Sequence, residues 1–324
     1  MMIKTKCFCP DTTRLYKNMR IGVDIGGTKC AVVSGNESGV VRKIRFATTS
    51  KDETIRNIIA AVRELGGGSA IGISCGGPLD AGRGLILSPP NLIGWDEVPI
   101  VKIMEDAFGV PAYLRNDADA CALAEWKYGA GRGTENMIFL TFGTGMGAGL
   151  ILGGRLYSGS CGMAGEIGHV RMAPFGPTGY GKLGSFEGFC SGGGIAQLGR
   201  AFALEKLQRG ETLPYCKDKT ELDGITAKTL ADFARAGDET ALAVYRFCGE
   251  KLGEGLAILV DVLNPQKIVI GSIFARAQDL LRAPMEAALR REALSYSLAR
   301  CEIVPAALGE AIGDYAALAV SYGA

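Results

Sequence analysis

The feature that most constrains the fold of this chain is a pattern that occurs twice, in the same order. Each copy begins with an apolar strand, a glycine-rich turn and a second strand: IGVDIGGTKCAVVSG at 21–35 and MIFLTFGTGMGAGLILGG at 137–154. Each copy later contains an apolar strand that ends in small residues, SAIGISCGGP at 69–78 and QKIVIGSIF at 266–274. A repeated set of such units predicts a duplicated α/β architecture.

Segments with apolar residues at helical spacing lie between these strands. In 52–65, for example, Ile55, Ile58, Ile59 and Val62 fall on one face of a helix. We expect further helices at 117–129, 227–236, 239–263, 278–294 and 311–322. The longest is stopped by Asn264–Pro265.

Composition narrows the class of protein. The chain has 324 residues, enough for one large domain or two, and its 35 Lys and Arg residues nearly balance 34 Asp and Glu. This balance disfavours nucleic acid as a partner, and the apolar runs are too short to span a membrane. The ten cysteines are scattered, so we interpret them as reduced thiols of a cytoplasmic protein, most of them buried.

The first residues do not have the pattern of a folded element. Residues 1–20 are polar and lack the apolar core of a signal peptide, and we expect the first strand to start at Ile21, with Met19 as an alternative start of the chain. We therefore interpret 1–20 as a disordered or misannotated leader.

The two glycine-rich turns are candidates for phosphate binding. In FGTGMGAG, a turn between strands exposes consecutive backbone N–H groups that form a nest for an anion. A dinucleotide fingerprint would have to feed a helix, and no G-K-[ST] follows for a P-loop. Two such turns, the first with Asp24 and Thr28, could hold the phosphates of a nucleotide, with Asp24 orienting water around Mg²⁺. Purely structural turns are the alternative.

Two other positions carry polar groups that are suited to catalysis or binding. Asn116 and Asp117 follow a strand and precede a helix, where sites gather in α/β proteins. Asp117 is either an N-cap or a carboxylate that takes a proton from a substrate hydroxyl. His169, the only histidine, lies between Glu166 and Glu187 in a glycine-rich stretch. His169 could be a metal ligand, a catalytic base, a substrate contact or a core residue.

Seven motifs together resemble the ROK family of bacterial sugar kinases and sugar-responsive repressors. They occur in the family's order over 20–324: DIGGTK, CGGP, PPNLIGW, RNDADACALAE, GTGMGAGLILGGRLYSG, AGEIGH and LNPQKIVIG. The resemblance implies an actin-like, hexokinase or ribonuclease H-like duplicated fold of two α/β domains with a cleft between them. The small domain would comprise 21–117 and about 307–324, and the large domain 118–306.

The resemblance also implies an activity and a role for individual residues. The protein would be a cytoplasmic homodimer or homotetramer that transfers phosphate from ATP to a hexose or N-acetylhexosamine, usually at C6, with Asp117 as the catalytic base. The sugar-binding residues would be Gly77, Asn91, Asn116, Asp117, Glu166, His169 and Glu187. The ATP-binding residues would be Asp24, Gly26, Gly27, Thr28, Lys29, Gly143, Thr144, Gly145, Gly147 and Gly271, with Mg²⁺ near Asp24. The family's next glycine after Gly271 is Ser272 here.

One family feature is altered in this chain. The family's C-x-C-G-x-x-G-C-x-E segment, whose three cysteines hold a structural zinc together with the histidine, falls on 178–187. The cysteine positions are Thr178, Tyr180 and Ser185. We therefore expect no structural zinc, because hydroxyls are poor zinc ligands. His169 would keep only its sugar contact, and Tyr180 and Phe186 would anchor the loop by packing.

Two other function classes compete with the kinase. A sugar-responsive repressor of the same family would carry an N-terminal DNA-binding domain, and only 20 residues precede the first expected strand. A non-catalytic sugar- or nucleotide-binding relative would have no need of Asp24 and Asp117. ATP and a monosaccharide are therefore the expected partners, with neither nucleic acid nor a membrane.

Overall fold

The computed structural model describes residues 18–323, which divide into two compact units. Unit 1 comprises 18–120 and 311–323, and unit 2 comprises 121–310. Residues 1–17 of the predicted leader lie outside the described residues. The first strand begins one residue before the expected Ile21, because Arg20 already pairs with Gly35.

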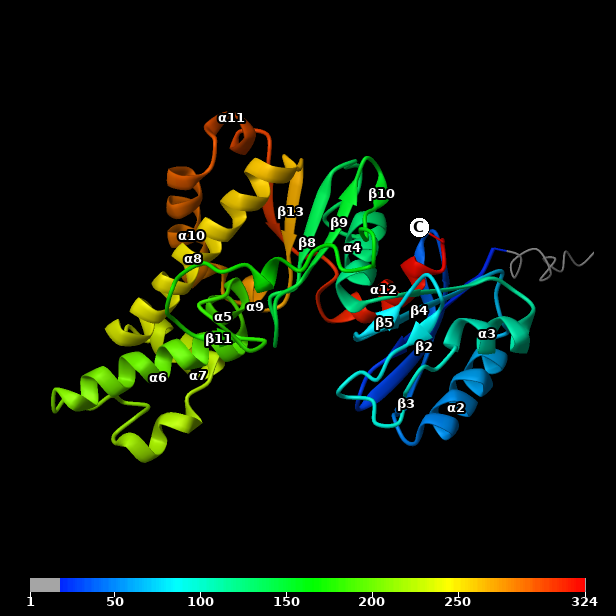
Figure 1. Cartoon of the computed structure of the whole chain (residues 1–324), viewed down its shortest axis with the longest axis horizontal. Helices are drawn as coiled ribbons and strands as arrows, with labels where there is room; N and C mark the ends of the chain where they lie inside the picture. The colour runs from blue at the N-terminus through cyan, green and yellow to red at the C-terminus, as the bar shows by residue number, and fades with distance from the viewer. Residues whose placement is uncertain (1–17, 324) are drawn as a thin grey trace, which may run out of the picture. The chain divides into compact units, whose positions relative to one another are not determined.

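The main sheet of unit 1 has five strands in the order β3-β2-β1-β4-β7 (Figure 1). Their bounds are β1 Arg20–Ile25, β2 Lys29–Asn36, β3 Gly39–Ala47, β4 Ile71–Cys75 and β7 Ala112–Arg115. The first three strands are antiparallel, whereas β4 and β7 continue the sheet in parallel with β1. A small separate sheet pairs β5 (Leu79–Asp80) with β6 (Leu85–Ile86).

The main sheet of unit 2 repeats this topology. Its order is β10-β9-β8-β13-β14, again with three antiparallel strands followed by two parallel ones. The bounds are β8 Met137–Leu140, β9 Ala148–Leu152, β10 Arg155–Leu156, β13 Lys267–Ile270 and β14 Glu302–Pro305. The predicted duplication of an α/β unit is therefore confirmed.

Helices cover both faces of the unit 1 sheet. Helices α2 (Lys51–Glu64) and α3 (Ile100–Phe108) pack on the face to which the apolar residues of β1 and β4 point. Helix α12 (Ile312–Val320) lies on the other face (Figure 1).

Two glycines allow α12 to approach this sheet closely. Gly22 of β1 and Gly72 of β4 are partners in the parallel register. A Cβ atom on Gly22 would lie 2.4 Å from the backbone nitrogen of Leu318, and one on Gly72 would lie 2.2 Å from that of Ser321. The backbone of α12 therefore rests directly on the backbone of the sheet.

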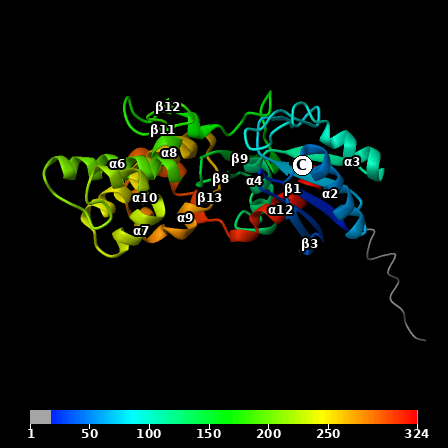
Figure 2. The same ribbon diagram turned by 90° about the horizontal axis from the view of Figure 1, so that it is seen from below.

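Unit 2 is built around its longest helix, α8 (Glu239–Leu263), which packs on α10 (Gln278–Glu292) and also contacts α6 and α7. The other helices are α4 Asp117–Tyr128, which begins in unit 1, α5 Phe186–Phe189, α6 Gly192–Gln208, α7 Ala227–Arg235, α9 Ile273–Arg276 and α11 Ser295–Leu298. Short 3₁₀ helices are η1 Ile167–His169, η2 Lys219–Gly224 and η3 Gly309–Ala311. The hairpin of β11 (Thr178–Gly179) and β12 (Lys182–Leu183) lies over α6 (Figure 2).

All the predicted helices form, with ends within two residues of those expected. Among the longer helices, α3 and α6 were not predicted; α6 begins with Gly192, Gly193 and Gly194, and glycine is a poor helix former. The Ser191 hydroxyl compensates by accepting a hydrogen bond from the Gly194 N–H at 3.0 Å.

Two expectations from composition can also be compared with the structure. The cysteines in 18–323 are all free, and five of the eight are buried. No helix in this part of the chain combines the length and hydropathy of a membrane span.

The contact of α12 with the sheet predicts that Gly72→Ala is destabilising. Alanine in a strand is ordinarily favoured over glycine by about 0.5–1 kcal/mol. Here the new methyl group would overlap the backbone of α12, and overpacking of this kind costs about 1–3 kcal/mol. We expect a net fall in the free energy of unfolding, measured by urea unfolding. Gly224→Ala is the control, because its Cβ atom would meet nothing within 4 Å. Equal stability of both variants would contradict the proposed contact.

Candidate functional site

The first glycine-rich turn, between β1 and β2, is fixed by hydrogen bonds to Thr48. The Thr48 hydroxyl donates to the Gly26 carbonyl at 2.6 Å, and the Thr48 N–H donates to the Thr28 carbonyl at 3.1 Å. A Cβ atom on Gly27 would lie 2.6 Å from the carbonyl oxygen of Asn91. The structure thus brings the predicted residues of this turn together with Asn91, and glycine is required where the two loops touch.

Asp24 precedes this turn and lies in a region of concentrated negative charge. Burial of the carboxyl group, followed by the charges of Asp117 and Asp314, raises its pKa to about 7, although Lys43 and Lys29 act in the opposite direction. Lys43 forms an ion pair with Asp314, in the first turn of α12. Such a region favours a bound cation.

Helix α12 also makes room for the Asp24 side chain. A Cβ atom on Gly313 would lie 3.3 Å from Oδ2 of Asp24. Neither Gly313 nor Asp314 was among the predicted site residues, because their position depends on the packing of the last helix against the first strand. The sequence offered no local signal for it.

Asp117 and Asn116 lie at the carboxyl end of β7, as the sequence analysis expected. Asn116 Oδ1 accepts a hydrogen bond from the Asp119 N–H at 2.8 Å, so Asn116 caps the start of α4. The alternative reading of Asp117 as the N-cap is therefore wrong. The Asp117 carboxylate is accessible to solvent, yet the protein surrounds it closely enough for burial to raise its pKa.

Gly76 and Gly77 follow β4 at the same edge of the sheet. A Cβ atom on Gly76 would lie 3.5 Å from Oδ2 of Asp117, and one on Gly77 would meet nothing within 4 Å. Packing within the described residues therefore does not require glycine at 77, where a cis peptide bond joins it to Pro78.

The second glycine-rich turn, between β8 and β9, uses several of its own amides. The Gly147 N–H donates to the Thr141 hydroxyl at 2.8 Å, and the Gly143 N–H donates to the Gly145 carbonyl at 3.1 Å. No hydrogen bond found in 18–323 uses the N–H groups of Thr144 and Gly145. These two amides are therefore left available to a ligand.

Two further segments of unit 2 converge on this turn. The Gly192 N–H, at the start of α6, donates to the Gly143 carbonyl at 2.8 Å. The Ile273 N–H donates to the Phe142 carbonyl at 2.8 Å, and the Gly271 N–H donates to the Leu140 carbonyl at 2.9 Å. The predicted residue Gly271 is thus held beside the turn.

Glu187, from α5, is hydrogen-bonded to the same turn. Its Oε2 atom accepts from the Met146 N–H at 2.9 Å, and a Cβ atom on Gly145 would lie 2.8 Å from that oxygen. A Cβ atom on Gly168 would lie 2.0 Å from the Met146 carbonyl and 3.4 Å from Cβ of Glu187. Glycines therefore allow Glu187 and the 166–169 segment to lie against the turn.

His169 is exposed at the end of η1, as is Glu166 at its start, so the reading of His169 as a core residue is wrong. The β11–β12 hairpin supports the histidine. The ring of Tyr180 meets the imidazole edge-on at 6.4 Å between centroids, and Lys182 Nζ donates to the His169 carbonyl at 2.7 Å.

The hairpin occupies the segment where the resemblance implies zinc. Tyr180 and Gly181 have φ of 44° and 73°, as in a two-residue type I′ turn. The Gln197 side chain both donates to and accepts from the backbone of Thr178, at 2.9 Å each. Backbone and side-chain hydrogen bonds therefore hold this segment.

Of the two predicted apolar anchors of this segment, Phe186 is confirmed and Tyr180 is wrong. Phe186 is fully buried against Gly255, whose Cβ atom would lie 2.3 Å from the phenyl ring. Tyr180 is 90% exposed, because the tip of the hairpin directs it away from the core. Phe189, which is 2% exposed and packs against Phe247, is the second anchor.

The side chains at the three positions where the resemblance implies cysteine do not fit a zinc site. Thr178 and Tyr180 are exposed, and the buried Ser185 hydroxyl accepts from the Gly188 N–H at 3.0 Å as the N-cap of α5. Across 18–323, no group of three or more His, Cys, Asp or Glu side chains is arranged to hold a metal. The serine thus orients the short helix that carries Glu187.

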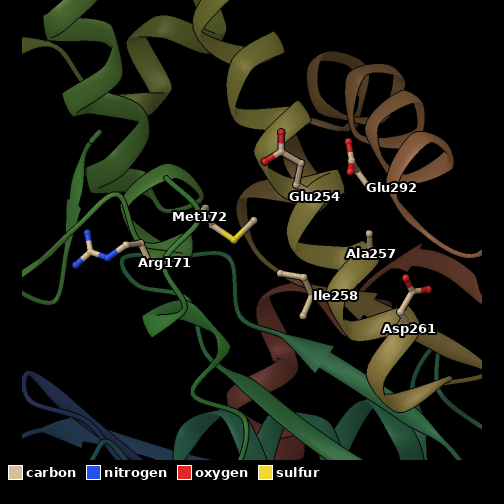
Figure 3. A pocket seen from close by; sticks show the side chains of 7 residues that line it. All are labelled: Arg171, Met172, Glu254, Ala257, Ile258, Asp261 and Glu292. Carbon is tan, nitrogen blue, oxygen red and sulfur yellow. The ribbon is translucent and has the colours of Figure 1, made fainter. Parts of the chain in front are cut away.

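Unit 2 also contains a pocket of about 510 Å³ (Figure 3). Its lining consists of Arg171, Met172, Glu254, Ala257, Ile258, Asp261 and Glu292. Glu254 pairs with Lys251 at 2.7 Å, and Asp261 accepts from the Leu294 N–H at 3.0 Å. Two of its acidic groups are therefore already partnered, and none of the predicted site residues lines the pocket.

Comparison with known proteins gives a consistent family. Residues 20–321 match the profile of the ROK family. A glucokinase of Streptomyces coelicolor is 34% identical over 84% of this chain and 87% of its own length. An N-acetylmannosamine kinase of Escherichia coli is 32% identical over 85% of this chain and 90% of its own length. The crystal structure of a ROK family glucokinase from Streptomyces griseus, in complex with glucose and AMPPNP, is 30% identical with a TM-score of 0.72 and covers 94% of this chain and 100% of its own.

The raised pKa of Asp24 predicts how stability depends on pH. Between about pH 4 and pH 7 the folded state keeps a proton that the unfolded chain has lost, so the free energy of unfolding should fall as the pH rises through this interval. The fall due to Asp24 should be on the order of 1–3 kcal/mol. Urea unfolding at pH 5 and pH 7.5, without divalent ions, measures it. Asp24→Asn cannot titrate and should show the smaller fall; an equal or larger fall would contradict the assignment.

The hydrogen-bonded hairpin predicts that the fold does not depend on zinc. Purified protein should contain well under one equivalent of zinc, and EDTA should leave its melting temperature unchanged when Mg²⁺ is absent. His169→Ala should weaken sugar binding far more than it lowers the melting temperature, because the imidazole is exposed. Stoichiometric zinc in elemental analysis, or a His169→Ala protein that unfolds without any loss of sugar affinity, would contradict this account.

Proposed function

The chain belongs to the ROK family, and from this premise we propose that it is an ATP-dependent kinase that phosphorylates the C6 hydroxyl of a hexose or N-acetylhexosamine. The observation that carries the proposal lies in unit 1. Asp117, at the end of β7, is close enough to Asp24, beside the first glycine-rich turn, to raise the pKa of that residue. A candidate base and a candidate phosphate-binding turn therefore share one electrostatic environment.

In this proposal, Asp117 orients the sugar hydroxyl and accepts its proton. A general base works best when its pKa approaches the working pH, and burial shifts the pKa of Asp117 in that direction. Asn116 contributes beside it. Because its Oδ1 accepts from the Asp119 N–H, its NH₂ group is left to donate to a sugar oxygen.

The phosphates of ATP are assigned to the two glycine-rich turns. In unit 1, the backbone of Gly26, Gly27 and Thr28 and the Lys29 ammonium group supply donors. In unit 2, the N–H groups of Thr144 and Gly145 supply donors, whereas Gly143 and Gly147 shape the turn through their internal hydrogen bonds. Gly271, whose N–H donates to the Leu140 carbonyl ahead of this turn, is assigned to the same binding region.

Sugar kinases of this kind work with a divalent metal, and the residues of unit 1 fit Mg²⁺. This ion keeps several waters and takes one or two carboxylates together with substrate phosphates, so Asp24 alone is a sufficient protein ligand. When bound with ATP, Mg²⁺ neutralises charge on the phosphates. The negative charge around Asp24 favours such a cation, and we assign the Mg²⁺ site to this residue.

The remaining predicted residues are assigned to the sugar. Carboxylate, imidazole and amide groups distinguish hydroxyl positions, because a missing hydroxyl leaves such a group without a partner. Glu166, His169 and Glu187 supply these groups in unit 2, and Asn91 supplies one in unit 1. Gly77 is assigned to the sugar as well, because no atom of the described residues lies within 4 Å of where its Cβ atom would be.

A sugar-responsive regulator without kinase activity is the alternative. Binding alone needs no general base, so the position and the raised pKa of Asp117 favour the enzyme. The free cysteines and the use of ATP lead us to assign the protein to the cytoplasm, and the expected homodimer or homotetramer remains a prediction.

Asp117→Asn tests the proposal. The amide keeps the shape of the side chain but cannot accept a proton, so kcat should fall by about 10²–10⁴ while sugar affinity changes by only a few fold. Asp106→Asn, an exposed carboxylate of α3 that pairs with Lys102, removes the same charge and should leave kcat unchanged. A coupled assay of ADP release measures both variants. A kcat near that of the unmutated protein for Asp117→Asn would refute the assignment of the base.

A further inference from the structure

Ser272 has a backbone conformation that only glycine adopts readily. Its φ is 52° and its ψ is −109°, outside the left-handed region where Asn264, at 44° and 55°, caps α8. Residues in such conformations persist where their surroundings hold them, and they gather at ligand sites. Ser272 lies just after β13, separated from it only by Gly271.

The neighbours of Ser272 fix this conformation. The Gly271 N–H donates to the Leu140 carbonyl and the Ile273 N–H to the Phe142 carbonyl, at 2.9 and 2.8 Å. The backbone is thus tied to the second glycine-rich turn on both sides of the serine. The hydroxyl lies beside that turn, 3.5 Å from the position that a Cβ atom on Gly143 would occupy.

Arg276 sets the direction of the Ser272 hydroxyl. Its Nη2 donates to Ser272 Oγ at 3.1 Å, which leaves the hydroxyl hydrogen to donate to another acceptor. The guanidinium is largely exposed, and its ion pair with Glu310, at 3.7 Å, involves a carboxylate that is 98% exposed and therefore screened. The pair offers one O–H donor and a positive charge, and the hydroxyl lies beside Gly143, in the turn whose Thr144 and Gly145 amides are not otherwise used.

We propose that Ser272 and Arg276 together bind a phosphate of the donor nucleotide that is not transferred. Clustered donors and a positive charge match the oxygens of a phosphate better than the uncharged ribose or base. This inference rests on the proposed function, since it takes a nucleoside triphosphate as the donor. It adds two residues that the motif-derived ATP-binding set did not include.

Binding of ADP and of adenosine, measured by calorimetry on the full chain without sugar, tests the inference. Ser272→Ala and Arg276→Gln should each weaken ADP binding about tenfold or more, because each removes a charge-assisted hydrogen bond. Adenosine, which has no phosphate, should bind within about twofold of its affinity for the unmutated protein. The double variant should lose less than the product of the two single losses, because the residues act through one another.

Two control variants separate the effects of net charge and of backbone strain from the loss of the contact with phosphate. Arg290→Gln removes one positive charge from α10 and should leave ADP binding unchanged. Ser272→Gly relieves the backbone, so its melting temperature should rise by a few degrees, while its ADP affinity should fall as far as that of Ser272→Ala.

The inference is overturned if the Ser272 and Arg276 variants bind ADP and adenosine equally more weakly, or if the binding of neither is weakened. Absence of ADP binding by the unmutated protein overturns it as well. Because these measurements involve no turnover, normal ADP binding by a chain that phosphorylates no sugar would count against the proposed function alone.

Discussion

The site in unit 1 depends on the contact of α12 with the backbone of two strands. Because Gly22 and Gly72 have no side chains, the helix rests on the sheet, and its first turn reaches Asp24. Gly313 leaves room for the carboxylate there, and Asp314 adds a charge that raises its pKa. The last helix of the chain therefore completes a site that begins in the first strand.

Close approach at glycine organises unit 2 in the same way. Gly145 and Gly168 allow Glu187 and the segment of His169 to lie against the second turn. Hydrogen bonds hold the 178–187 segment in place, with Ser185 capping the helix that carries Glu187. A buried serine is well suited to this, because its single oxygen satisfies a helix N–H group that would otherwise be unpaired.

The parts of the structure that were predictable are those with a local or repeated signal. Strand periodicity and glycine turns predicted both sheets, and family motifs pointed to Asp24 and Asp117. Tyr180 was assigned wrongly because its exposure follows from the positive φ of a turn, and an aromatic residue gives no hint of that conformation. Gly313 and the strain at Ser272 were missed because both arise from contacts between distant segments.

The central claim is that this chain transfers the terminal phosphate of ATP to a sugar hydroxyl at C6. The most direct measurement is ADP release with glucose, N-acetylmannosamine and other hexoses in turn, followed by ³¹P and ¹H NMR of the product. The account predicts that at least one sugar gives ADP and sugar phosphate in equal amounts, with the phosphorus coupled to the protons on C6. ADP release that is independent of every sugar, or a phosphate on the anomeric oxygen, would contradict it.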